Sequence, residues 1–136
     1  MPSYLRFAGA SLPGSVGSDV TGGARISDGR AGHLSFGPHV SLEPGRYIAG
    51  FRLKKLPNCQ AGRITVDVYS PATGVLSSNF VYSSELFEAT SSLNHLEFSL
   101  DQTAHQLEAR MYVQEDIMVQ LDELVIFAQD SRGWDG

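Results

Sequence analysis

From position 33 onward, apolar and polar residues repeatedly alternate at every second position, and this pattern constrains the fold more than any other feature. The clearest case is residues 47–53, where tyrosine, alanine, phenylalanine and leucine occupy alternate positions. Such alternation is typical of a half-buried β-strand, because successive side chains point to opposite faces of the sheet. The same period recurs in residues 63–69, 95–100 and 107–113.

Turn-forming residues separate these segments. Pro44-Gly45 precedes the segment at 47–53, and Ser70-Pro71-Ala72-Thr73-Gly74 follows the segment at 63–69. Both favour tight turns, because Pro presets φ and Gly accepts positive φ. About eight short strands, spaced about ten residues apart, are typical of a sandwich or barrel. The sequence therefore predicts an all-β fold, a single antiparallel jelly-roll β-sandwich over residues 1–136 with 128–136 as a frayed tail.

Length and charge limit the possible functions. A chain of 136 residues can bury one core without metal or disulfide staples and is short for two domains. Its net charge is −5 and its pI is about 5.2, which disfavours nucleic acids and anionic membranes as partners. The single cysteine, Cys59, cannot form an intramolecular disulfide, and the N-terminus lacks the pattern of a signal peptide. These two features favour a cytoplasmic location.

A glycine-rich stretch over residues 9–32 lacks apolar periodicity, so it is predicted to be a loop with one short strand at 24–26. Long loops of this kind often carry function. The segment 27–33, Ser-Asp-Gly-Arg-Ala-Gly-His, is therefore a second candidate ligand site, as a loop closing over one edge of the sandwich. An ordinary flexible loop is the simpler interpretation. The glycines do not form a phosphate-binding motif, because no GxGxxG follows a strand.

The outward-facing side chains of three predicted strands are the main candidates for ligand binding. They are Arg52, Asp67, Tyr69, Arg110 and Tyr112. If the three strands share one sheet, these side chains line one polar surface. The set suits a sugar, because a carboxylate accepts from paired hydroxyls, a guanidinium donates a planar fork, and a phenol ring packs against C–H groups. The alternative is a solvated sheet face with cross-strand ion pairs.

No pattern indicates catalysis or a transition-metal site. The chain has no GxSxG or HExxH motif, which favours a protein that is not an enzyme. His33 and His39 do not show the clustered ligands of a cupin-like metal site. Structural calcium is the better-supported metal: if Leu121 and Val125 are buried, Asp122 points away from the core and offers a carboxylate to a hard cation. An exposed aspartate without a metal is the simpler interpretation.

Four segments together resemble a known family. They are Phe36-Gly37-Pro38, Leu42-Glu43-Pro44-Gly45-Arg46-Tyr47, Val66-Asp67-Val68 and Val119-Gln120-Leu121-Asp122-Glu123-Leu124-Val125-Ile126. They are similar to the galactose-binding-domain-like jelly rolls of carbohydrate-binding modules. In that superfamily a Leu-x-Pro-Gly-x-Tyr turn feeds a core strand, and a final strand carries an Asp-x-Leu/Val pattern. The resemblance covers residues 33–128 and extends to modules appended to bacterial glycan-handling proteins.

The resemblance implies a lectin-like, non-catalytic module that binds a carbohydrate, on its own or within a larger parent protein. Two features depart from the family pattern. The only tryptophan is Trp134, in the tail rather than in a sugar-stacking loop, and residues 4–8 lack the glutamate that helps many modules to bind calcium. The alternative function is a structural or assembly domain that uses an exposed sheet face or edge to form a homo-oligomer or bind a partner. A cupin-like metalloenzyme is a third interpretation.

Overall fold

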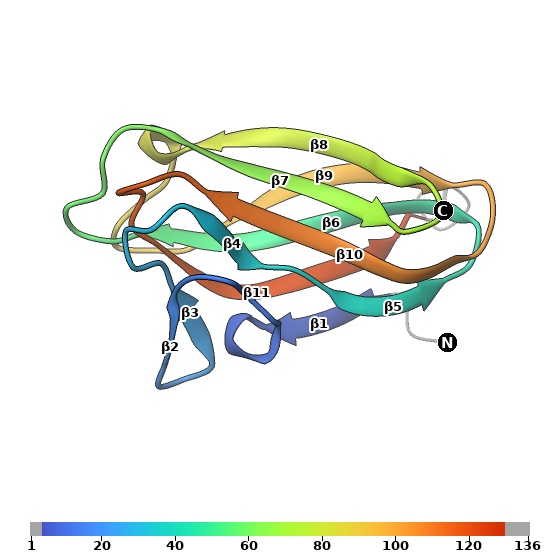
Figure 1. Cartoon of the computed structure of the whole chain (residues 1–136), viewed down its shortest axis with the longest axis horizontal. Coiled ribbons are helices and arrows are strands. Elements are labelled where there is room, and N and C mark those ends of the chain that lie inside the picture. Colours follow the sequence, from blue (N-terminus) through green and yellow to red (C-terminus); the bar gives the residue numbers. More distant parts are fainter. Residues whose placement is uncertain (1–3, 130–136) are drawn as a thin grey trace.

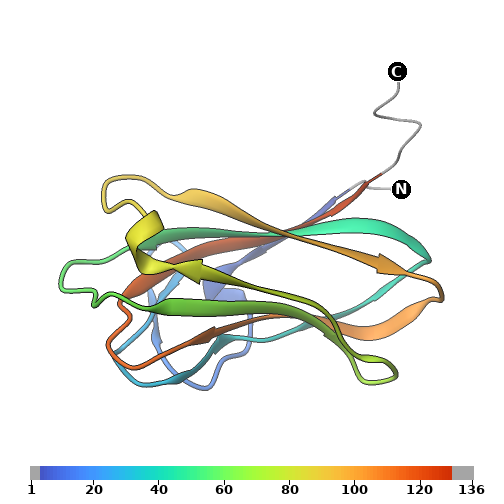
Figure 2. The same cartoon turned by 90° about the horizontal axis from the view of Figure 1, so that it is seen from above.

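The computed structural model describes residues 4–129, which form two antiparallel β-sheets packed face to face (Figure 1). Figure 2 shows the two sheets as separate layers. The six-stranded sheet contains β1 (Tyr4–Ala8), β2 (Ser18–Val20), β3 (Ala24–Ile26), β6 (Gly45–Lys55), β9 (Ser92–Leu100) and β11 (Val119–Ala128). The five-stranded sheet contains β4 (Gly32–Ser35), β5 (Pro38–Leu42), β7 (Arg63–Ser70), β8 (Gly74–Tyr82) and β10 (Ala104–Val113).

The order of strands is β2-β3-β11-β6-β9 in the six-stranded sheet and β4-β10-β7-β8 in the five-stranded sheet. In each sheet, two strands pair with the same side of one longer strand. β1 and β3 pair with different parts of β11, and β4 and β5 pair with different parts of β10. Between β4 and β5, Gly37 has a φ of 99°, in the left-handed region that favours glycine, and its carbonyl accepts from the Ala109 N–H at 2.7 Å.

The predicted antiparallel β-sandwich is confirmed, with eleven strands in residues 4–129 rather than about eight. The additional strands are short. The glycine-rich stretch contains the predicted segment at 24–26, which is β3, and adds β2, which pairs with it as a hairpin. Residues 32–42 are divided into β4 and β5. Two single-turn 3-10 helices, Gly9–Ser11 and Ser83–Glu85, complete the regular structure. Neither of these turns, nor any other helix of the described chain, has the length and apolar character needed to span a membrane.

The hydrophobic core lies between the sheets, on the sides that the alternating pattern predicts. The fully buried side chains from β6, β7, β10 and β11 include Phe51, Leu53, Ile64, Val66, Val68, Leu107, Met111, Leu121, Leu124 and Ile126. Because every second residue of β7 and of most of β10 is buried in this core, the side chains between them are held on the outer face of the five-stranded sheet.

The alternation fails in β11, where the pairing with β6 shifts register between Leu121 and Glu123. Such a bulge adds one residue to a strand and reverses the sides on which later residues lie. Leu121, Leu124 and Ile126 therefore join the core, whereas Val125 lies on the outer side of the sheet with Glu123. Leu121 and Val125 are both buried, as expected, at 0% and 4% exposed, but the bulge places them on opposite sides of the sheet.

At the C-terminal end, β11 continues to Ala128, the first residue of the predicted tail. The rest of that tail from position 130, including Trp134, lies outside the described residues.

Candidate functional site

The outer face of the five-stranded sheet brings four of the five candidate residues together. β7 and β10 are adjacent and antiparallel, and Asp67 lies directly opposite Arg110. Tyr112 pairs with Thr65 on one side of this pair, and Tyr69 pairs with Glu108 on the other. These side chains alternate with the buried residues of both strands, so they all lie on the outer face.

Asp67 and Arg110 form a bidentate ion pair on this face. The Arg110 Nε–H donates to Asp67 Oδ1 at 2.8 Å, and an Nη2–H donates to Asp67 Oδ2 at 2.9 Å. The hydrogen bond to Asp67 raises the pKa of Arg110 above its ordinary value. The Arg110 guanidinium also lies 4.4 Å from the centroid of the Tyr69 ring. Tyr69, Arg110 and Asp67 therefore hold one another in a fixed arrangement, as cation–π and fork geometries require.

Tyr112 offers the most accessible ring among the candidate residues, with 39% of the residue exposed. Its ring meets the His33 ring edge to face, with the centroids 5.3 Å apart. Burial, and next the positive charge of Arg110, lower the pKa of His33 below its ordinary value. His33 lies on this face because it pairs with Tyr112 across β4 and β10, whereas the sequence analysis placed it in the candidate loop at 27–33.

Strand β8 adds residues to the face that sequence reasoning missed. Phe80 lies opposite Thr65, Tyr82 lies opposite Arg63, and Ser78 lies opposite Asp67. Phe80 and Tyr82 are 42% and 47% exposed. The sequence signal was weak, because β8 is an edge strand whose exposed residues include both aromatic and polar side chains.

Arg52, the fifth candidate, lies elsewhere. It is on β6 in the six-stranded sheet, and its Nε–H donates to Glu123 Oε2 at 2.9 Å. Glu123 also accepts from Arg6 on β1 at 2.7 Å, and this hydrogen bond is the main reason why its pKa lies below the usual range. The expectation that all five residues line one surface is therefore corrected. Alternation separates inward from outward residues but does not say which sheet a strand joins.

Asp122, the candidate calcium ligand, lies at the β11 bulge. One of its carboxylate oxygens accepts from the side-chain amide of Gln120 at 2.6 Å, and the other accepts from the Ser91 hydroxyl. Calcium typically takes about six to eight oxygen ligands, several of them carboxylates. Residues 4–129 contain no group of three or more histidine, cysteine or acidic side chains that could hold a metal ion. Asp122 therefore offers a single carboxylate, and both of its oxygens are already engaged by Gln120 and Ser91.

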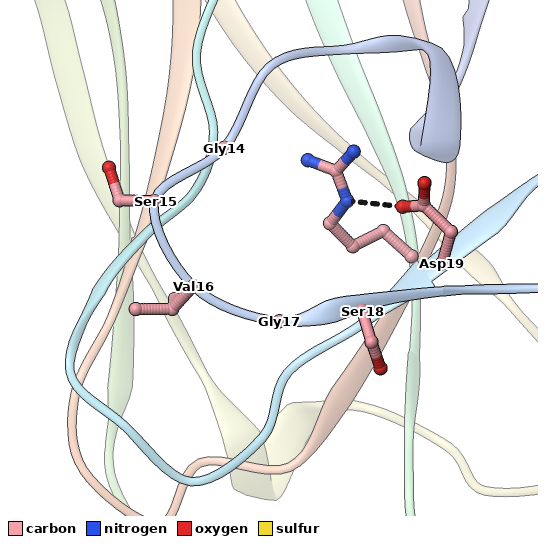
Figure 3. Close-up of a pocket in the computed structure, with 7 residues that line it drawn as sticks. Gly14, Ser15, Val16, Gly17, Ser18 and Asp19 are labelled. Atoms are coloured by element: carbon pink, nitrogen blue, oxygen red, sulfur yellow. Dashed lines mark hydrogen bonds and ion pairs between the residues drawn. The ribbon is translucent and has the colours of Figure 1, made fainter.

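The glycine-rich stretch curves around a pocket from Gly14 to Asp19 (Figure 3), and Arg25 also lines this pocket. Arg25 is 8% exposed and donates to Asp19 Oδ1 at 2.9 Å, to the Leu34 carbonyl at 3.0 Å and to the Ala10 carbonyl at 3.3 Å. It lies beside a polar pocket of about 220 Å³, which is lined otherwise by residues 14–19. Because Asp19 and two backbone carbonyls already engage the guanidinium, Arg25 anchors the loop.

The predicted loop at 27–33 is held by similar internal contacts. Asp28 accepts from the Gly17 backbone N–H at 3.2 Å and from the Arg30 guanidinium at 2.7 Å and 3.0 Å. The hydrogen bond from Arg30 lowers the pKa of Asp28 to about 2. The backbone of this segment also bonds to the turn after β10, because the Gly29 carbonyl accepts from Asp116 N–H at 3.0 Å. The Asp28 side chain and the Gly29 carbonyl thus fix this loop to Gly17 and Asp116, and Arg30 is paired with Asp28.

This chain resembles known proteins in its fold but not in its sequence. No protein-family model matches the sequence, and no curated protein matches it. Solved structures do match. The C-terminal CBM6 module of a marine laminarinase from Zobellia galactanivorans has a TM-score of 0.62 at 12% identity, with 91% of this chain and 98% of the module covered. The chain has the fold of a carbohydrate-binding module.

Two further carbohydrate-binding modules have the same fold. A CBM6 module of lichenase 5A from Cellvibrio mixtus, solved in complex with cellotriose, has a TM-score of 0.64 at 11% identity, with 93% of this chain and 98% of the module covered. A family 35 carbohydrate-binding module from Clostridium thermocellum has a TM-score of 0.63 at 14% identity, with 94% and 100% covered. The predicted resemblance is thus confirmed at the level of the fold. Some matched chains are longer enzymes, of which this chain spans only 18–34%.

Proposed function

We propose that this protein is a non-catalytic carbohydrate-binding module, and that the glycan binds on the outer face of the five-stranded sheet. The observation that carries the proposal is the arrangement on β7 and β10. A bidentate Asp67–Arg110 pair is flanked along the strands by Tyr69 and Tyr112. The fold adds support, because it is shared with carbohydrate-binding modules, one of which was solved in complex with cellotriose.

The chemistry of this face suits a sugar. The carboxylate oxygens of Asp67 retain lone pairs beyond those used by Arg110, so they can accept from ring hydroxyls. The exposed ring of Tyr112 offers an apolar surface to the C–H groups of a pyranose, and its hydroxyl offers a donor at the rim. The assembly alternative predicted a flat apolar patch, whereas this face mixes an ion pair, hydroxyls and aromatic rings.

We also propose that glycan binding by this face does not depend on calcium. Both carboxylate oxygens of Asp122 are engaged by Gln120 and Ser91. At the glycine-rich stretch, the Arg25 guanidinium already supplies a cation to the Asp19 carboxylate and to two carbonyls. A divalent ion there would have to displace or repel that guanidinium.

A glycan array tests the proposed function when it is read with two matched variants. Tyr112→Ala removes an exposed ring from the proposed face, and Tyr4→Ala removes a ring that is 48% exposed from the six-stranded sheet. We expect the wild type to bind a defined set of glycans, Tyr112→Ala to lose about ten-fold or more in affinity, and Tyr4→Ala to keep it. Equal binding by both variants would refute the proposed location.

A further inference from the structure

Two arginines lie over aromatic rings on the outer face of the five-stranded sheet, and only one of them is paired with a carboxylate in the described part of the chain. Arg110 lies over Tyr69 and is neutralised by the Asp67 carboxylate. Arg63 lies over Phe80, with its guanidinium carbon 4.1 Å from the ring centroid. Within residues 4–129, no carboxylate lies at ion-pair distance from Arg63, and no side-chain hydrogen bond engages its guanidinium.

The position of Arg63 places this unneutralised cation beside the proposed sugar site. Arg63 begins β7 and lies opposite Tyr82, while Phe80 lies opposite Thr65, which also pairs with Tyr112. Side chains that are neighbours across strands and two positions apart along a strand lie within reach of one another and of a ligand that spans them. Arg63 and Tyr112 are therefore parts of one continuous surface.

The stacked Arg63 guanidinium also limits how the Phe80 ring can contact a sugar. Because a guanidinium lies over its ring, that side of the ring cannot serve as a platform for a neutral sugar. The surface presents instead a planar cation, with donors in a rigid fork that matches carboxylate and sulfate oxygens. A stacked guanidinium is also partly ordered before the ligand arrives, so less rotamer entropy is lost on binding.

We infer that the ligand is an anionic glycan, carrying carboxylate or sulfate groups, and that Arg63 determines this specificity. This inference rests on the proposed function and deepens it. The net charge of −5 makes long-range steering of an anion unfavourable, so selectivity for the anion must come from direct contact with Arg63. Arg63 thus acts through a local, salt-sensitive contact.

The test compares charged and uncharged forms of the same polymers. Polygalacturonate is measured against its methyl ester, and dextran sulfate against dextran, beside a glycan array that contains neutral, uronate-bearing and sulfated glycans. The first pair reports carboxylate recognition and the second reports sulfate recognition. Affinity is measured for the wild type, for Arg63→Gln and for Arg46→Gln. Arg46 is an exposed arginine on the six-stranded sheet, so its variant carries the same charge change away from the face.

We expect the wild type to prefer anionic glycans, and Arg63→Gln to lower their affinity about ten-fold or more while its unfolding curve stays unchanged. Arg46→Gln should bind as the wild type does, and Arg63→Lys should recover only part of the affinity because it lacks the fork. Binding of neutral glycans alone, or anionic binding that Arg63→Gln leaves unchanged, would overturn this inference and leave the proposed function standing. Silence toward every glycan would overturn the proposed function, and this inference with it.

Discussion

Asp67 and Arg110 face each other across β7 and β10 and are joined by two hydrogen bonds of 2.8 Å and 2.9 Å. Their side chains are only 16% and 22% exposed, so water screens the pair less than it would at an open surface. The pair is thus a structural element of the sheet as well as part of the proposed sugar site. Variants at these positions will change stability and binding together.

Replacing Asp67 by alanine should destabilise the protein by about 1–2 kcal/mol, because Arg110 is left without its partner. Equilibrium unfolding in urea measures this difference. Asp67→Asn keeps the shape and one acceptor oxygen, so it should cost less than Asp67→Ala. If Asp67→Ala unfolds at the same urea concentration as the wild type, the pair contributes nothing and the account of this face is wrong.

Arg25 should be the main anchor of the glycine-rich stretch. Arg25→Met removes the cation while keeping much of the side-chain length, and it leaves the Leu34 and Ala10 carbonyls without their donor. We expect a loss of about 2–3 kcal/mol in the free energy of unfolding. Amide hydrogen exchange should also become faster in residues 14–19. Unchanged exchange there would mean that the loop is held by other contacts.

The pKa of Asp28 provides a pH test of the loop contacts. A carboxylate-detected NMR titration should give a value of about 2 in the wild type, because Arg30 stabilises the ionised form. In Arg30→Gln the pKa should rise toward the ordinary value of 3.8. Since the folded-state pKa is lowered, any stability from this contact is present above pH 3.8 and is lost as the pH falls toward about 2. If the pKa of Asp28 is the same in the variant, Arg30 is not the cause of its low value.

Removal of divalent ions should leave the thermal stability of the protein unchanged. Thermal unfolding measured in EDTA and in excess calcium should give the same Tm, because a ligand that binds only the folded state would raise it. Magnesium at the same concentration controls for ionic strength. A calcium-specific increase in Tm would show that the donors around Asp122, or another set, hold the ion after all.

The inward faces of the central strands were predictable from the sequence alone. Residues 47–53, 63–69 and 107–113 alternate, and their buried positions are the predicted ones because one side of each strand must enter the core. The outward positions of Asp67 and Arg110 follow from the same argument. These strands are central in their sheets, where burial is strongest and the pattern is clearest.

The remaining features depend on information that alternation does not contain. A sandwich has two outer faces, so the pattern placed Arg52 outward without assigning it to the six-stranded sheet. One extra residue at the β11 bulge moved Val125 to the outer side. Arg63 and Phe80 were missed because their stacking joins an exposed arginine to an exposed edge strand, where no core imposes a period.

Binding of the glycan to the outer face of the five-stranded sheet can be observed residue by residue. The measurement is an NMR titration of the labelled protein with the glycan-array ligand that binds most tightly. The perturbed amides should cluster at residues 63–69, 78–82 and 110–112. Perturbations confined to the connecting loops at 27–31 and 56–62, with β7 and β10 unaffected, would contradict it.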